Sequence, residues 1–205
     1  MPESPKLGVF GGSFDPVHLG HLGIAEEARG KFALDSVIFV PAANPPHKGG
    51  RTLAPAPDRM EMVRLAIAGN PRFAASDVEL HRDGPSYTID TLQEMQSLHP
   101  GARLFFIVGA DSLAELDRWH RAAELVRRFD FVIVGRPGVS PIGRAALVAA
   151  FGEACAVRLE ASFLQTEPYN ISATEIRRRV AAGESIRYLV PLAVERYILR
   201  TGLYQ

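Results

Sequence analysis

Two histidines, His18 and His21, lie three residues apart directly after a glycine-rich turn. The segment from Gly11 to His21 reads GGSFDPVHLGH, and its two leading glycines let the backbone approach a ligand closely, with positive φ available at little steric cost. Gly20, between the histidines, removes a side chain where a bulky group could lie. If a helix begins here, its N-terminus carries partial positive charge and N–H groups that favour anions. Two imidazoles on one face of that helix would add donors, so the segment predicts contact with phosphate oxygens.

Two simpler interpretations of these histidines stay open at this point. One is an ordinary helix that begins with two histidines, one of which caps it. The other is a metal site, but zinc proteases place histidines four apart with a glutamate between them, and here the spacing is three with no glutamate. The sequence also contains no G-x-x-x-x-G-K-[ST] phosphate loop and no G-x-G-x-x-G fingerprint. The coincidence of a strand, a glycine turn and a helix start favours the phosphate interpretation.

A second candidate phosphate element lies at 171–177, where the sequence reads ISATEIR. Ser172 and Glu175 have the spacing of a capping box, which begins a helix. Ser172 and Thr174 would offer hydroxyl donors at that helix N-terminus, and Arg177 would follow one turn later, an arrangement that suits a triphosphate. Three consecutive arginines begin at Arg177, and since helix positions turn by about 100° each, one of them at most can face the capped end. The alternative is a well-capped helix and nothing more.

The elements that must position these residues follow from the hydrophobic pattern. Short β-branched and aromatic runs alternate with longer amphipathic segments, which is typical of a parallel sheet flanked by helices. The expected strands cover 7–11, 36–41, 73–80, 103–109, 129–135 and 156–159. The expected helices cover 18–32, 58–68, 88–98, 141–151, 172–182 and 191–200, with one or two more within 111–128. Residues 42–57 are rich in proline and are expected to form a long loop.

This order of elements predicts an α/β fold, a doubly wound, Rossmann-like parallel sheet. We expect one domain over 1–205, with a helical C-terminal portion from about 171 to 205, since no internal repeat or linker interrupts the pattern. In doubly wound sheets ligands bind outside the carboxyl ends of the strands. The turn after the first strand is therefore where a ligand is expected.

Composition and charge exclude several classes of function. Lys plus Arg and Asp plus Glu both count 23, so the formal net charge is zero, which argues against a broad nucleic-acid or membrane surface. The first residues lack the pattern of a secretory signal, and no apolar run approaches the roughly 18 residues that span a bilayer. We expect a soluble cytoplasmic protein without nucleic-acid or membrane partners. The only cysteine, Cys155, excludes an intrachain disulfide and is expected to be a small buried hydrophobe.

The segment GGSFDPVHLGH resembles the G-x-F-x-P-x-H-x-G-H signature of the nucleotidyltransferase superfamily, which is related to the class I aminoacyl-tRNA synthetase core. This resemblance implies that His18 and His21 contact the triphosphate of a nucleotide and stabilise the transition state at its α-phosphorus. The segment at 171–177 resembles the I-S-x-T-x-x-R element of the same superfamily, with Ala173 where close relatives often carry a second serine. The residues on the matching positions are Ser172, Thr174 and Arg177.

Three further segments narrow the resemblance. Residues 45–48 read PPHK, residues 85–92 read PSYTIDTL, and residues 109–112 read GADS, with Trp119 beyond them. Taken singly they have simpler interpretations, namely a solvated lysine in a surface loop, a helix N-cap and a core tryptophan. Together and in this order they resemble the bacterial nicotinate mononucleotide adenylyltransferases over nearly the whole chain.

That resemblance implies transfer of the adenylyl group of ATP to nicotinate mononucleotide, which gives nicotinate adenine dinucleotide and pyrophosphate in NAD biosynthesis. The residues expected to carry catalysis are His18, His21, Lys48 and Arg177. The residues expected to bind ATP are Gly11, Gly12, Ser13, Phe14, His18, His21, Gly109, Asp111, Arg136, Ser172, Thr174 and Arg177, of which Gly109, Asp111 and Arg136 would lie on the adenosine side. The residues expected to bind nicotinate mononucleotide are Ser13, Lys48, Ser86, Tyr87, Thr88, Trp119 and His120, the last at a position where relatives often carry tyrosine. Mg²⁺ is expected to arrive with ATP, because no acidic cluster in the sequence suggests a dedicated metal site.

Other functions remain as alternatives. A pantetheine-phosphate adenylyltransferase would share both phosphate elements, but it is usually shorter and lacks the PSYTIDTL-type segment. A tRNA synthetase would need a lysine-rich K-M-S-K-S-type loop and an RNA-binding domain. A nucleotide-binding sensor without turnover would not need both histidines. The expected partners are the small molecules ATP and nicotinate mononucleotide, and the sequence leaves a homodimer open.

Overall fold

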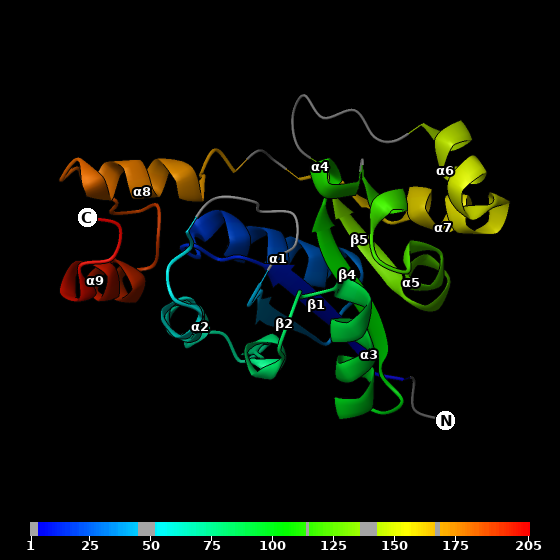
Figure 1. The fold of residues 1–205 in the computed structure, drawn as a ribbon, viewed down its shortest axis with the longest axis horizontal. Coiled ribbons are helices and arrows are strands. Elements are labelled where there is room, and N and C mark those ends of the chain that lie inside the picture. The colour runs from blue at the N-terminus through cyan, green and yellow to red at the C-terminus, as the bar shows by residue number, and fades with distance from the viewer. Residues whose placement is uncertain (1–3, 45–51, 114, 136–142, 167–168) are drawn as a thin grey trace.

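The structure, a computed structural model, describes residues 4–44, 52–113, 115–135, 143–166 and 169–205. Within them the strands form one parallel sheet in the order β3-β2-β1-β4-β5-β6 (Figure 1). The strands are β1 (Lys6–Gly12), β2 (Ser36–Pro41), β3 (Phe73–Ala75), β4 (Arg103–Gly109), β5 (Asp130–Val134) and β6 (Phe163–Leu164). The doubly wound α/β fold is thereby confirmed.

The helices cover both faces of this sheet. They are α1 (Leu19–Lys31), α2 (Ala56–Ile67), α3 (Thr88–Leu98), α4 (Ala110–Leu113), α5 (Ala122–Arg128), α6 (Arg144–Phe151), α7 (Glu153–Ala161), α8 (Ala173–Ala181) and α9 (Leu192–Thr201), with 3₁₀ turns η1 (Val78–His81) and η2 (Leu116–Arg118). The apolar sides of α3, α5, α6 and α7 enter one core cluster, and those of α1, α2, α8 and α9 enter the other. In Figure 1, α8 and α9 lie at the opposite end of the molecule from α6 and α7.

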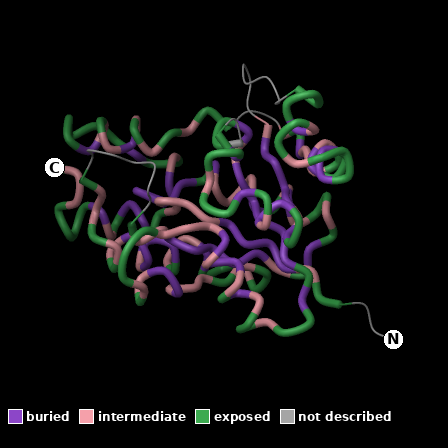
Figure 2. Tube along the Cα trace, turned by 45° about the vertical axis from the view of Figure 1, so that its right-hand side comes forward, coloured by how far each residue is buried: buried purple, intermediate pink, exposed green. Residues whose placement is uncertain are grey.

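The central strands are buried on both faces, which explains their unbroken hydrophobic sequences. Along β4, Leu104, Phe106 and Val108 enter the first cluster, whereas Phe105 and Ile107 enter the second. This alternation is the period of two that a pleated strand imposes. Figure 2 shows the buried residues gathered on these strands, with exposed residues on the outer helices and loops.

The sheet order creates a crevice at the carboxyl ends of β1 and β4. After β1 the chain moves outward to β2 and β3, and it later returns to place β4 on the other side of β1. Connections leaving β1 and β4 therefore turn to opposite sides, which is the topological switch point where doubly wound folds bind ligands. Both Gly11–His21 and Gly109–Ser112 begin at this crevice. No helix in the described part of the chain is long and apolar enough to cross a membrane.

Three sequence expectations about elements were wrong. The expected strand at 156–159 belongs to α7, because Cys155, Ala156 and Leu159 are buried at helical spacing, and the edge strand follows at β6. The strand expected over 73–80 ends at Ala75 and gives way to η1. The segment 111–128 forms three short helical pieces rather than one or two helices. Cys155 is buried, as expected for a small hydrophobe.

Candidate active site

The turn between β1 and α1 brings the first motif to the crevice. Gly11 and Gly12 lie in the extended backbone of β1 and do not use the positive φ available to glycine, whereas Phe14 has a φ of 44°. The glycines serve close packing: a Cβ on Gly12 would lie 3.1 Å from the Phe14 ring, and one on Gly11 would lie 3.2 Å from the Phe106 ring. The absence of these side chains lets an aromatic floor approach the β1 backbone.

His18 and His21 form a stacked pair at the N-terminus of α1. His18 is the N-cap residue and is buried, and its ring centroid lies 3.7 Å from that of His21 at an interplanar angle of 23°. The backbone N–H of His18 donates to Nδ1 of His21 at 3.2 Å. Because Nδ1 accepts this bond, a neutral His21 carries its proton on Nε2, where it can donate to a ligand. The predicted juxtaposition of the two imidazoles is confirmed.

Two phenylalanine rings also pack against His21. The Phe14 ring meets His21 edge-on at a centroid distance of 5.1 Å, and the Phe10 ring does so at 6.0 Å. Position 20 favours glycine for a steric reason, since a Cβ there would lie 3.1 Å from Nδ1 of His18. The imidazole pair is therefore fixed by packing before any ligand enters, which is the preorganisation that electrostatic catalysis requires.

The second motif begins α8. Ser172 is its N-cap, and its Oγ accepts a hydrogen bond from the backbone N–H of Glu175 at 3.2 Å, which is the serine half of the predicted capping box. The carboxylate of Glu175 accepts bonds from Arg178 and Arg179, at 2.8 and 2.9 Å. These two guanidinium groups lower the pKa of Glu175 to about 2. Glu175 thus keeps two neighbouring arginines on the outer side of the helix.

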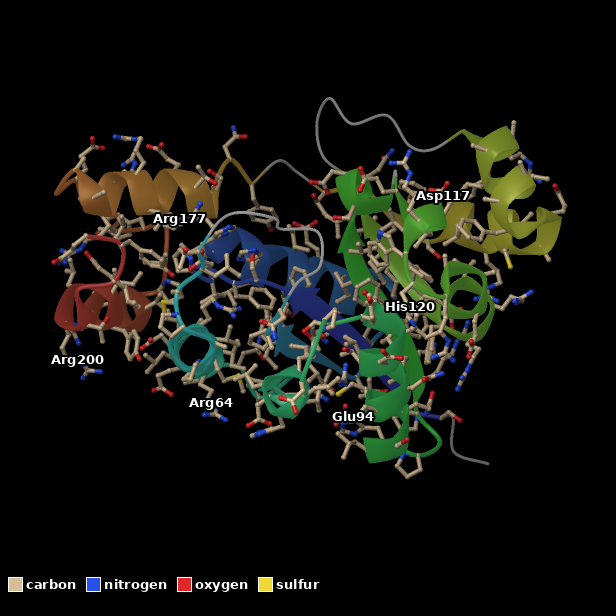
Figure 3. The ribbon with its side chains drawn as sticks, in the orientation of Figure 1. Arg64, Glu94, Asp117, His120, Arg177 and Arg200 are labelled. Carbon is tan, nitrogen blue, oxygen red and sulfur yellow. The ribbon has the colours of Figure 1, made fainter. Side chains whose placement is uncertain are left out.

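Arg177 faces the other way, into the site. Its Nη1 donates to the backbone carbonyl of Asp15 at 2.6 Å, and its Nη2 donates to Oγ1 of Thr174 at 3.0 Å. Its Nη1 also lies 3.8 Å from the Asp15 carboxylate, and its side chain is only 17% exposed. Figure 3 shows Arg177 on the side of α8 that faces the rest of the domain. The expectation that one arginine of the three faces the capped end is confirmed.

Both motifs line one cavity of about 690 Å³. The N-terminus of α1 forms one wall and that of α8 the other. The predicted ATP-binding residues in its lining are Ser13, Phe14, His18, His21, Ser172, Thr174 and Arg177. Two helix N-termini that face one space, with imidazole, hydroxyl and guanidinium donors between them, can bind a polyanion. We call this space the phosphate cavity.

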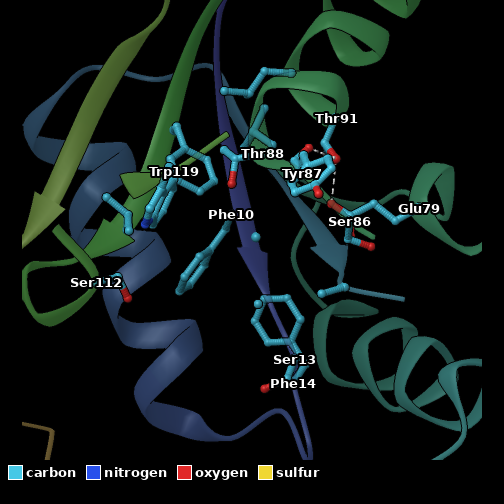
Figure 4. A pocket seen from close by; sticks show the side chains of 18 of the residues that line it. Phe10, Ser13, Phe14, Glu79, Ser86, Tyr87, Thr88, Thr91, Ser112 and Trp119 are labelled. Atoms are coloured by element: carbon cyan, nitrogen blue, oxygen red, sulfur yellow. Dashed lines mark hydrogen bonds between the residues drawn. The ribbon is translucent and has the colours of Figure 1, made fainter. Parts of the chain in front are cut away.

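A second cavity, of about 480 Å³, lies over the ends of β1 and β4 (Figure 4). Figure 4 shows the Trp119 indole at one side and Ser86 and Tyr87 at the other. Its lining includes the predicted residues Gly11, Gly12, Ser13, Phe14, His21, Ser86, Tyr87, Thr88, Gly109, Asp111, Trp119 and His120. Ser13, Phe14 and His21 line both cavities, so the two spaces meet at the β1–α1 turn. We call the second space the aromatic cavity.

Two pairs of aromatic rings pack together in the lining of the aromatic cavity. The His120 ring stacks on Tyr87 at 4.2 Å, and Trp119 meets Phe106 edge-on at 6.1 Å. Gly109 and Asp111, expected on the adenosine side, line this cavity and not the phosphate cavity. Lys48 and Arg136 lie outside the described residues.

Comparison with known proteins identifies the fold family of this site. A model of the family described as cytidylyltransferase-like matches residues 9–179, which span both phosphate motifs. Curated relatives match along nearly the whole chain: a probable nicotinate-nucleotide adenylyltransferase of Thermus thermophilus is 46% identical over 98% of this chain and 100% of its own, and one of Thermomicrobium roseum is 42% identical over 98% and 92%. The chain belongs to the nicotinate-nucleotide adenylyltransferase family.

Solved structures agree on the fold. The Plasmodium falciparum nicotinic acid mononucleotide adenylyltransferase complexed with NaAD superposes with a TM-score of 0.75 at 19% identity, covering 98% of this chain and 97% of that one. The same enzyme complexed with APC superposes with a TM-score of 0.73 over the same shares. The nucleotidyltransferase fold is thus shared even where most residues differ.

The sequence did not reveal three residues that support the site in this member of the adenylyltransferase family. Arg59 of α2 is 1% exposed and donates to the backbone carbonyls of Ser13 and Ala42, at 2.8 and 2.7 Å, and to that of Ala54 at 2.9 Å. Asp15 is 2% exposed, and its Oδ1 accepts a hydrogen bond from Tyr204 Oη at 2.7 Å. In sequence, Arg59 resembles an ordinary surface charge of a helix, and nothing near Tyr204 signals a partner in the first motif.

Gly20→Ala tests the packing of the histidine pair in this adenylyltransferase. The new Cβ would force the His18 ring to move by a few tenths of an ångström. We expect kcat to fall about threefold to tenfold, because small misplacements of catalytic groups slow transfer. Gly30→Ala, on the same helix with open space around its Cβ position, is the matched control. Steady-state kinetics of both variants test this prediction. Equal kcat values for the two would contradict the packing role of Gly20.

Proposed function

We propose that this chain transfers the adenylyl group of ATP to nicotinate mononucleotide and releases nicotinate adenine dinucleotide and pyrophosphate, a step in NAD biosynthesis. The observation that carries the proposal is the junction of the two cavities. A cavity with two helix N-termini, His18 and Arg177 suits a triphosphate, and it shares His21 in its lining with an aromatic cavity that suits a planar ring. The curated relatives with this name, matched over nearly their whole length, support the same reaction.

In this reaction an oxygen of the mononucleotide phosphate attacks the α-phosphorus of ATP, a new P–O bond forms, and the bond to pyrophosphate breaks. The attacking phosphate is already ionised at neutral pH, so no general base is needed. The protein must align the two substrates and stabilise the charge that develops on the phosphoryl oxygens. The stacked histidines at the junction of the cavities are suited to this task.

We assign roles to the residues accordingly. His18 and His21 would donate to the oxygens around the α-phosphorus, with His21 using its Nε2 proton. Ser172, Thr174 and Arg177 would bind the leaving pyrophosphate, and Lys48 would neutralise phosphate charge. The aromatic cavity would hold the nicotinate ring between Thr88 and Trp119. Gly109 and Asp111, which line that cavity, would lie where the two nucleosides approach each other, and Arg136 would contact the adenosine.

Mg²⁺ would enter with ATP and neutralise the charge of the pyrophosphate that leaves. Among the described residues no group of three or more His, Cys, Asp and Glu side chains could hold a metal ion. The proposed carrier of the metal ion is the nucleotide. We propose that the protein acts in the cytoplasm on small molecules and not on nucleic acid or membranes, in line with its formal net charge of zero.

The test is a pyrophosphate-release assay with ATP and one acceptor at a time. We expect rapid release with nicotinate mononucleotide and slower release with nicotinamide mononucleotide. Phosphopantetheine, the acceptor of the rival adenylyltransferase, should give no release above the ATP-only background. Nicotinate adenine dinucleotide should accumulate in equal amount to pyrophosphate. ATP binding without release would favour a nucleotide-binding sensor, and turnover of phosphopantetheine alone would refute the proposed acceptor.

A further inference from the structure

Tyr204, in the segment that follows α9, contacts Asp15 of the first motif, 189 residues earlier in the sequence. Its hydroxyl donates to Oδ1 of Asp15 at 2.7 Å. Its backbone φ is 67°, in the left-handed region that disfavours residues other than glycine. An unfavourable conformation of this kind persists where the surroundings fix it, and such residues concentrate near functional sites.

Asp15 is the point where several parts of the site meet. Its Oδ1 also accepts the backbone N–H of Ala54 at 3.2 Å. Its Oδ2 lies 3.8 Å from Nη1 of Arg177, and its backbone carbonyl accepts a hydrogen bond from the same nitrogen at 2.6 Å. The buried carboxylate of Asp15 thus accepts hydrogen bonds from the C-terminal segment and from the end of the loop after β2. It also lies near the arginine of the phosphate cavity.

The hydroxyl of Tyr204 is a dependable donor. Burial, together with the hydrogen bond to Asp15, raises the pKa of Tyr204 above its ordinary value. The hydroxyl therefore stays protonated throughout the range in which enzymes work. Each donor on a carboxylate disperses part of its charge, which weakens the attraction of that carboxylate for another cation nearby.

We infer that Tyr204 is a positioning residue for the adenylyl-transfer reaction, acting through Asp15 on Arg177. The Tyr204 hydroxyl donates to Oδ1 and holds the carboxylate so that its Oδ2 lies 3.8 Å from Nη1 of Arg177. The guanidinium then remains at the wall of the phosphate cavity, beside Thr174. Without the hydroxyl, the carboxylate would draw Arg177 into a tighter pair and away from the phosphates. This inference rests on the proposed function, because it assigns Arg177 to the triphosphate.

Tyr204→Phe removes the hydroxyl and keeps the ring. We expect the dissociation constant for ATP to rise about fivefold and kcat to fall about tenfold, with KM for nicotinate mononucleotide unchanged, since the aromatic cavity is not involved. The matched control is Tyr197→Phe, which also removes a tyrosine–aspartate hydrogen bond of 2.7 Å, to Asp58, but one that joins α9 to α2 outside both cavities. Tyr197→Phe should leave ATP affinity and kcat within twofold of wild type.

A double-mutant cycle with Arg177→Gln separates positioning from a general loss of stability. Glutamine carries no charge that Asp15 could attract, so Tyr204→Phe should change ATP affinity by less than twofold in that background. Equal effects of Tyr204→Phe with and without Arg177→Gln would overturn the inference. A kcat for Tyr204→Phe within twofold of wild type would overturn it as well.

Asp15→Asn tests the part played by the carboxylate itself. It keeps an oxygen for the hydroxyl of Tyr204 and removes the charge through which Tyr204 would act, so adding Tyr204→Phe to it should alter ATP affinity by less than twofold. A fivefold change there would contradict the inference. ATP affinity is measured by titration calorimetry without an acceptor, so it reports on Tyr204 even if nicotinate mononucleotide proves not to be the acceptor. A wild type that binds ATP but forms no dinucleotide would refute the proposed function alone.

Discussion

His18→Ala is expected to lower kcat by a factor on the order of 10² to 10³ while the fold survives. The His18 imidazole is buried at the N-terminus of α1 and stacked on His21, facing the phosphate cavity. Charge that develops on the phosphoryl oxygens would lose a donor fixed in advance, which corresponds to roughly 3–4 kcal/mol of transition-state stabilisation. The proposed interaction would be made mainly in the transition state, so kcat and kcat/KM for ATP should fall together.

The measurement is steady-state kinetics alongside thermal unfolding by circular dichroism. His81→Ala is the control, because the His81 side chain is 75% exposed and its Nε2 lies 3.5 Å from the carboxylate of Asp77, outside both cavities. That variant should keep wild-type kinetics. The double variant His18→Ala/His21→Ala should be little slower than His18→Ala alone, since groups that act as a unit are not additive. A His18→Ala enzyme that works within threefold of wild type would rule out the assigned role.

The convergence of the two motifs could be predicted because it depends on local pattern and one topological rule. Hydrophobic strands such as 36–41 and 103–109 have turn residues on both sides, so their bounds in the structure are the same as those expected. A ligand at the carboxyl ends of parallel strands follows from the doubly wound fold. His18 and Arg177 each lie near the start of a helix whose cap is visible in the sequence, and the structure places both at one cavity.

What could not be predicted depends on contacts between distant residues. Arg177 bonds the Asp15 carbonyl across 162 residues, and Tyr204 bonds the Asp15 carboxylate across 189. No periodicity or capping rule relates such pairs, because their proximity exists only after the sheet and both helical layers have formed. The strand expected at 156–159 failed for a different reason. A short apolar run fits a buried strand and one face of a helix equally well, and packing on the core decided for the helix.

Arg59 supports the site through the backbone rather than through a ligand. Its Nε donates to the carbonyl of Ala54, and its Nη1 donates to the carbonyls of Ser13 and Ala42. These carbonyls belong to the β1–α1 turn and to both ends of the loop between β2 and α2. Burial lowers the pKa of Arg59, while the nearby charge of Asp15 opposes that shift. A buried guanidinium is thus the common donor for backbone segments that the sheet itself does not connect.

Arg59→Met should therefore lower the free energy of unfolding by about 3–5 kcal/mol. The side chain is 1% exposed, and its loss leaves three carbonyls without their donor, each at a cost of about 1–3 kcal/mol, partly offset because the desolvation of the charge is relieved. Methionine fills a similar volume, so a cavity contributes little. Urea unfolding at equilibrium measures the change, with an unchanged m-value as the sign that the two-state transition is retained.

Arg64→Met is the matched control for Arg59→Met. Arg64 lies on the same helix, its side chain is 55% exposed, and its surface ion pair with Asp77 spans 3.5 Å. Its replacement should change the free energy of unfolding by no more than about 0.5 kcal/mol. Arg59→Lys should fall between the two, because an ammonium keeps the charge but cannot reproduce the fork that reaches all three carbonyls. Equal unfolding midpoints for Arg59→Met and Arg64→Met would show that the carbonyls find other donors and that the buried guanidinium does not hold the turn and the loop together.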